Sequence, residues 1–243
     1  MIPIIHAQQL EVRYQQTLAL SNVTLDIPQH VRAAIVGPNG AGKSTFIKAL
    51  LQLVPATYQQ LELFQQPLEK VRQRIAYVPQ SAQVNWQFPT TVLDVVLMGI
   101  TSNRLGFQRI QPQQREQAHA ALEKMALLDL KNRQISQLSG GQKQRVFLAR
   151  AIAQNADLYL LDEPLAGVDI QSETLIMDYL QQLQQQGKTS LTVHHDLNTV
   201  PEYFDYVVFL NHGLIAHGAV SSTFTEQNIT KTYSQKVGTA YAV

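Results

Sequence analysis

Residues 37–45 of the chain, GPNGAGKST, have the types and spacing that bind a phosphate chain. They fit the pattern G-x-x-x-x-G-K-[S/T], in which glycines let backbone N–H groups point at phosphate oxygens. Lys43 is expected to reach the β- and γ-phosphates of a nucleoside triphosphate, and the Ser44 hydroxyl to coordinate Mg²⁺. The candidate phosphate contacts are Gly37, Pro38, Asn39, Gly40, Ala41, Gly42, Lys43, Ser44 and Thr45.

Residues 138–142, LSGGQ, form a second candidate anion site farther along the chain. They lead into an apolar run with helical spacing, so the N–H groups at the start of that helix would face an anion. The candidate contacts are Ser139, Gly140, Gly141 and Gln142. Because each segment supplies only half of a nucleotide site, the two together indicate an ATPase that works as a dimer.

A pair of acids follows an apolar run that predicts a strand at residues 158–161. Asp162 can hold the coordination shell of Mg²⁺, and Glu163 can orient the attacking water. Acids at a strand end more often cap a helix, so the catalytic interpretation depends on the phosphate loop in the same chain.

The elements around these motifs predict an α/β fold with a mostly parallel sheet. A β-rich segment is expected over residues 4–27, a helix from the phosphate loop to Pro55, another helix over residues 172–186, and a hairpin turn at residues 211–213. Short apolar strands are expected at residues 31–36, 75–78, 158–161, 190–193 and 206–210.

The chain is expected to form one domain over residues 1–243, with a helical lobe inserted at about residues 81–136 and a weakly patterned C-terminal tail at about 221–243. Its 243 residues are 45% hydrophobic, which is enough for one large domain. The net charge of +1 gives no field that favours nucleic acid. The sequence contains no cysteine, signal peptide or membrane-spanning apolar run, so a cytoplasmic location is expected.

The ordered motifs resemble those of an ABC transporter ATPase subunit over nearly the whole chain, and the sequence LSGGQ distinguishes that family from other P-loop NTPases. The motif set is residues 37–45, Gln80, residues 138–142, Asp162-Glu163, Asp169 and His195-Asp196. The resemblance implies a core with an N-terminal antiparallel β-subdomain and an inserted helical subdomain. It also implies ATP and Mg²⁺ as cofactors, and hydrolysis of ATP to ADP and phosphate.

The resemblance implies roles for individual residues as well. Tyr14 would stack on adenine, and Gln80 would reach both Mg²⁺ and the attacking water. Asp169 would cross the dimer interface, and His195 would contact the γ-phosphate. Residues 139–142 would contact ATP that is held by the opposite subunit of a head-to-tail homodimer.

Three segments, residues 84–99, 166–169 and 193–205, resemble the branch of the family that serves importers of manganese, zinc and iron, and we expect manganese first. In that branch the chain would lie on the cytoplasmic face of the membrane. Its partners would be permease subunits and, indirectly, an external metal-binding protein, with no nucleic acid. Trp86 and Phe88 would either receive the permease or simply pack within the lobe.

The motifs also bear on two other functions, and residues 55–64 depart from the family pattern. A P-loop kinase would have no use for LSGGQ or for His195-Asp196. A soluble ABC-type ATPase that acts on nucleic acid or the ribosome usually has a long coiled-coil insertion or two cassettes in one chain. Residues 55–64 lack the glycines that the family usually has there, so the local turn is uncertain.

Overall fold

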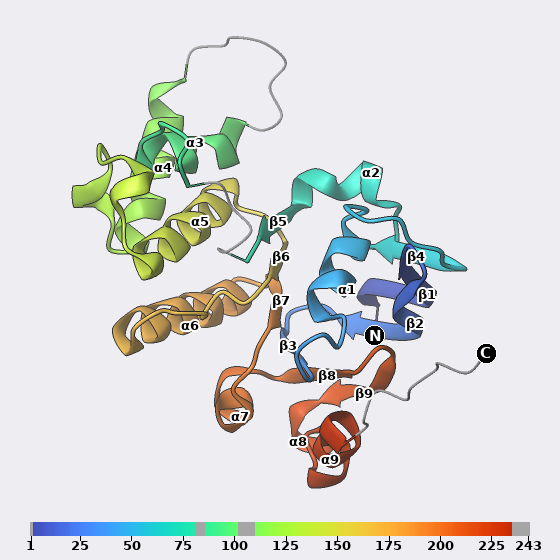
Figure 1. Cartoon of the computed structure of the whole chain (residues 1–243). Helices are drawn as coiled ribbons and strands as arrows, with labels where there is room; N and C mark the ends of the chain where they lie inside the picture. Colours follow the sequence, from blue (N-terminus) through green and yellow to red (C-terminus); the bar gives the residue numbers. More distant parts are fainter. Residues whose placement is uncertain (1, 81–85, 102–109, 235–243) are drawn as a thin grey trace. The chain divides into compact units, whose positions relative to one another are not determined.

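The computed structural model describes residues 2–80, 86–101 and 110–234. The chain divides into two compact units (Figure 1). The first unit combines Met1–Val71 with Leu191–Val243, and the second is Arg72–Ser190. The expected lobe begins at residues 81–85, and the expected tail ends at residues 235–243, which lie outside the described residues. A single functional domain over residues 1–243 therefore stays a prediction.

The first unit opens with the expected antiparallel sheet, whose strand order is β2-β1-β4. In β2, every second side chain from Val23 to Ile27 is buried, as the alternating sequence predicts. A tight turn between Tyr14 and Thr17 joins the first two strands. The strands are β1 (Pro3–Tyr14), β2 (Thr17–Pro28) and β4 (Gln60–Leu63).

The first unit also contains a parallel strand pair. Strand β3 (Arg32–Val36) pairs in parallel with β8 (Tyr206–Leu210), and β8 pairs antiparallel with β9 (Leu214–Ala219). The hairpin turn that the sequence predicts at residues 211–213 joins β8 to β9. The helices of this unit are α1 (Lys43–Leu50), α2 (Leu68–Val71), α7 (Val200–Tyr203), α8 (Val220–Thr223) and α9 (Glu226–Ser234).

The second unit contains a parallel pair, β5 (Ile75–Val78) and β6 (Leu158–Leu161). Helices α3, α4 and α5 pack on one another (Figure 1), as expected for a helical region. Strand β7 (Thr189–Val193) carries the chain back to the first unit. The helices are α3 (Val92–Thr101), α4 (Pro112–Lys124), α5 (Gly140–Gln154) and α6 (Ile170–Gln185).

The structure differs from the sequence-based expectation after the first helix. Helix α1 ends at Leu50 and does not continue to Pro55, because Gln52 adopts a left-handed backbone with φ 53°. Phe64 and Gln65 are also left-handed, with φ 54° and 58°, in the turn that follows β4. These turns therefore form without the glycines that the family usually has.

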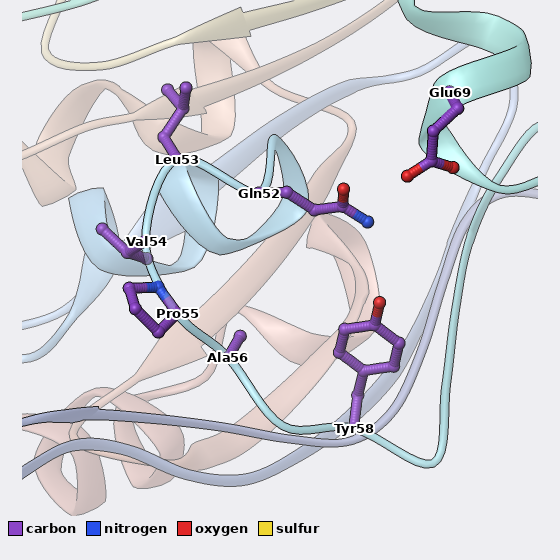
Figure 2. Close-up of a pocket in the computed structure, with 7 residues that line it drawn as sticks. All are labelled: Gln52, Leu53, Val54, Pro55, Ala56, Tyr58 and Glu69. Carbon is purple, nitrogen blue, oxygen red and sulfur yellow. The ribbon is translucent and has the colours of Figure 1, made fainter.

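An open cavity of about 550 Å³ lies beside the segment that follows α1. Figure 2 shows its lining, which consists of Gln52, Leu53, Val54, Pro55, Ala56, Tyr58 and Glu69. The phosphate loop precedes α1 and these residues follow it, so the cavity belongs to the other end of the helix. It is not the site that the phosphate-binding motif predicts.

Candidate nucleotide site

The phosphate loop follows the buried strand β3 and leads into α1. A Cβ atom at Gly37 would lie 1.9 Å from the carbonyl oxygen of Leu210, so no side chain fits there. Gly42 is left-handed, with φ 91°, and a Cβ atom there would lie 2.5 Å from the Leu20 side chain. These two glycines set the path of the loop, while Gly40 has open space where a Cβ atom would be.

Lys43 begins α1, and its side chain turns back over the loop. Its Nζ atom donates hydrogen bonds to the carbonyl oxygens of Gly37 and Pro38, at 2.8 and 2.9 Å. The residue is buried, so the carbonyl oxygens compensate for desolvation of the ammonium group. Ser44 and Thr45 follow in the first turn, where N–H groups and the helix dipole favour a phosphate.

Residues far away in the sequence support this loop. In the turn between β8 and β9, the N–H of His212 donates to the carbonyl of Ala41 at 2.9 Å, and its carbonyl accepts from the N–H of Ser21 at 2.7 Å. Tyr233 in α9 lies near the backbone of Gly37. Burial raises the pKa of Tyr233, and the nearby backbone of Gly37 opposes the rise. The sequence predicts the hairpin turn, but neither of these contacts.

The first unit also holds Tyr14 and His195, both exposed. Tyr14 ends β1, and His195 follows β7. The neighbouring His194 is buried, and its Nε2 atom lies 2.7 Å from the Thr199 hydroxyl oxygen. His194 therefore has the structural role that the sequence favours for it, and His195 remains the candidate for phosphate contact.

The acid pair lies in the second unit, after β6. Asp162 is fully buried, and its N–H donates to the carbonyl of Val78 at 2.9 Å. Burial and the negative charge of Asp162 raise the pKa of Tyr77 to about 12. The Gln80 Nε2 atom donates to the Glu163 Oε2 atom at 2.7 Å, which joins two of the predicted catalytic residues.

The signature segment begins α5 with a capping box. The Ser139 hydroxyl accepts from the N–H of Gln142 at 3.3 Å, and the Gln142 side chain accepts from the N–H of Ser139 at 3.0 Å. Gly140 has open space where a Cβ atom would be, so a ligand can approach its backbone. The geometry thus gives Gln142 a structural role beside the predicted contact with nucleotide.

Asp169 lies beside the signature segment within the second unit. A Cβ atom on Gly141 would be 3.7 Å from its Oδ2 atom. The carboxylate caps α6 by accepting from the N–H and the hydroxyl of Ser172, at 3.0 and 2.8 Å. Hydrogen bonds from Ser172 lower the pKa of Asp169, so the carboxylate is charged at neutral pH.

The predicted magnesium ligands offer a hydroxyl, an amide and a carboxylate, from Ser44, Gln80 and Asp162. Oxygen donors of these kinds suit Mg²⁺, which in nucleotide sites also takes phosphate oxygens and water. Among the described residues, no group of three or more His, Asp or Glu side chains could hold a metal ion.

The profile of the ABC transporter family matches residues 20–166. The chain belongs to the ABC transporter family. Its ATP-binding relatives span nearly all of it. The zinc transport system ATP-binding protein TroB of Treponema pallidum (strain Nichols) is 49% identical over 96% of this chain and 88% of its own length. The manganese transport system ATP-binding protein MntB of Bacillus subtilis (strain 168) is 46% identical over 98% and 94%.

A solved structure supports the same fold for this ABC protein. It is a dimeric ATP-binding cassette in a post-hydrolysis state, bound to ADP and phosphate. It has a TM-score of 0.77 and 27% identity, and the match covers 89% of this chain and 98% of that chain. The expected α/β ABC ATPase fold is therefore confirmed. Within the described residues, no helix is long and apolar enough to span a bilayer.

Proposed function

We propose that this ABC ATPase powers an importer of divalent metal ions, with manganese as the first candidate and zinc or iron next. The main support is identity of 46–49% over nearly the whole chain with subunits named for manganese and zinc transport. The hydrogen bond from Gln80 to Glu163 supports hydrolysis as the energy source, because it places an amide and a candidate base together.

In this proposal two copies close head to tail around ATP and Mg²⁺. The phosphate loop, with Lys43 and Ser44, holds the triphosphate of one copy. Residues 139–141 of the opposite copy complete the site, because the backbone of Gly140 is open to a ligand. Glu163 orients water, and Mg²⁺ supplies charge neutralisation when it is bound. Closure brings the parts of the site together, and hydrolysis lets the dimer reopen.

The membrane partner would dock on the helical region of the second unit, on the cytoplasmic face of the membrane. Trp86 is half-buried against Phe147, which agrees with packing within the lobe. Phe88 is 62% exposed, so of the two aromatic residues it is the candidate for permease contact. Residues 84 and 85 of the segment that resembles metal importers lie outside the described residues. Metal selection would lie in the permease and an external binding protein.

Uptake of radiolabelled Mn²⁺ tests this proposal in cells whose chromosomal gene is deleted and which carry either wild-type or variant protein on a plasmid. Wild-type protein should restore uptake, and Glu163→Gln should not. Excess unlabelled Zn²⁺ or Fe²⁺ as competitor would show which ion is preferred. Uptake that does not depend on the protein, together with ATP-dependent association with ribosomes or nucleic acid, would favour the soluble ATPase instead.

A further inference from the structure

One face of α5 carries four long side chains that reach outward from the helix to other parts of the second unit. The residues are Lys143, Phe147, Arg150 and Gln154, which are separated by four, three and four positions. Residues with this spacing lie on one side of an α-helix. The stripe begins at the residue directly after the signature segment and ends at the last residue of the helix.

The N-terminal half of the stripe holds Trp86. The Trp86 ring meets the Phe147 ring edge to face, with centroids 5.0 Å apart and an interplanar angle of 72°. The Lys143 Nζ atom lies 5.3 Å from the centroid of the Trp86 ring. The Arg150 guanidinium lies 4.8 Å from the centroid of the Phe147 ring. Each ring is therefore contacted by one cation, the indole by Lys143 and the Phe147 ring by Arg150.

The C-terminal half of the stripe holds β5, the strand that leads to Gln80. Arg150 Nη2 donates to the carbonyl of Tyr77 at 3.0 Å, and Gln154 Nε2 donates to the carbonyl of Ile75 at 2.7 Å. Helix α3 fixes the same region, since a Cβ atom on Gly99 would lie 2.4 Å from the carbonyl oxygen of Arg150. Two hydrogen bonds to β5 and the close approach of α3 therefore fix this end of α5.

These contacts connect the segment that contains Gln80 and Trp86 with the signature segment at the start of α5. Gln80 follows β5, and Trp86 follows Gln80, while the signature serine is the N-cap of α5. Because β5 fixes the far end of α5, the contacts near its start set where the N-terminal end points, and Trp86 makes one of them beside the hydrogen bond from Arg145 to the carbonyl of Met125. We propose that Trp86 is a positioning residue, which holds the start of α5 so that the signature segment meets ATP on the opposite subunit.

This inference rests on the proposed ATPase dimer, and steady-state kinetics on the full chain test it. Trp86→Ala should lower kcat roughly tenfold or more, since small misplacement of a reacting group is costly. The KM for ATP should stay within about twofold, because ATP is held by the phosphate loop of the first unit. Trp86→Phe, which keeps an aromatic ring against Phe147, should recover most of kcat. Tyr58→Ala truncates an exposed aromatic residue beside the cavity and is the control.

Fluorescence tests the contact itself, because Trp86 is the only tryptophan in the chain. Lys143→Met removes the cation over the indole and should change its emission. Lys124→Met is the matched control, since that lysine lies 5.4 Å from the centroid of the Tyr179 ring instead. The emission of Trp86 in the Glu163→Gln protein should also change when Mg·ATP is added.

The outcomes separate this inference from the proposed function. Wild-type protein without ATPase activity would contradict the proposed function, while the Lys143 comparison would still test the packing of Trp86. An active wild type with Trp86→Ala at unchanged kcat would overturn the positioning role. Unchanged emission in Lys143→Met would overturn it as well, because the indole would then not lie under that cation.

Discussion

At the scale of single residues, non-glycine residues with a left-handed backbone conformation occur both in the candidate site and outside it. Glu163 has φ 54° immediately after the buried Asp162, where the strained backbone presents its carboxylate to Gln80. Such strain is often retained where function needs it. Gln65, with φ 58°, lies in a turn after β4, outside the predicted catalytic motifs. Its strained backbone therefore has no catalytic role in this proposal.

Gln65→Gly should therefore stabilise the protein. Relief of the left-handed strain contributes about 1–2 kcal/mol, and the greater freedom of glycine in the unfolded chain offsets about 0.5–1 kcal/mol of it. We expect a net gain of about 0.5–1 kcal/mol in the free energy of unfolding, measured by urea denaturation. Gln66→Gly, one residue later and without positive φ, is the control and should lose stability. Equal effects at the two positions would argue against relief of strain.

The buried His194 predicts a dependence of stability on pH. Burial lowers its pKa, although the charge of Asp196 opposes this. The folded protein therefore favours the neutral ring, whereas the unfolded chain binds a proton below its ordinary pKa of about 6.5. The stabilising effect is present above that pH and is lost as the pH falls below it, by at most about 1.4 kcal/mol per pH unit.

Urea midpoints between pH 5 and pH 8 test this prediction. Wild-type protein should lose stability toward pH 5, and His194→Gln should lose less. Some dependence will remain in that variant, because burial also lowers the pKa of His217. Parallel pH curves for the two proteins would mean that His194 does not carry the effect.

At the scale of elements, the start of α5 combines a structural role with a predicted functional one. Ser139→Ala removes the side-chain cap and should cost about 1 kcal/mol of stability. Ser139→Asp keeps a good N-cap, but it places a negative charge where a γ-phosphate is expected. We expect near wild-type stability with at least a roughly hundredfold loss of ATPase activity for Ser139→Asp. Activity that followed stability in both variants would limit Ser139 to capping.

The strands were the most predictable elements, and the contacts of the phosphate loop were the least predictable. Short apolar runs with clear ends gave β5, β6 and β8 with their observed bounds, residues 75–78, 158–161 and 206–210. Helices α8 and α9 were missed because their segment has a polar sequence with little periodicity. The motifs identify candidate site residues, but contacts such as that of Ala41 with His212 depend on the folded chain.

At the scale of the whole molecule, the predicted function requires two chains. Glu163→Gln should still bind Mg·ATP, because the phosphate loop is intact, and it should hydrolyse ATP at least roughly a hundredfold more slowly. The closed dimer should therefore accumulate. Size-exclusion chromatography with light scattering should detect a dimer of the variant in Mg·ATP and fewer dimers in Mg·ADP. Full turnover by this variant would remove Glu163 from its proposed role.

The support of the phosphate loop by residues late in the chain has a consequence for biosynthesis. Synthesis proceeds from the N-terminus, so Gly37 and Lys43 leave the ribosome long before Leu210, His212 and Tyr233. Until then, the loop lacks the Leu210 carbonyl that packs against Gly37 and the His212 N–H that donates to the carbonyl of Ala41. A nascent or C-terminally truncated chain therefore contains the nucleotide motif without the partners that shape it. Binding competence should arise only after residues 210–212 have been synthesised.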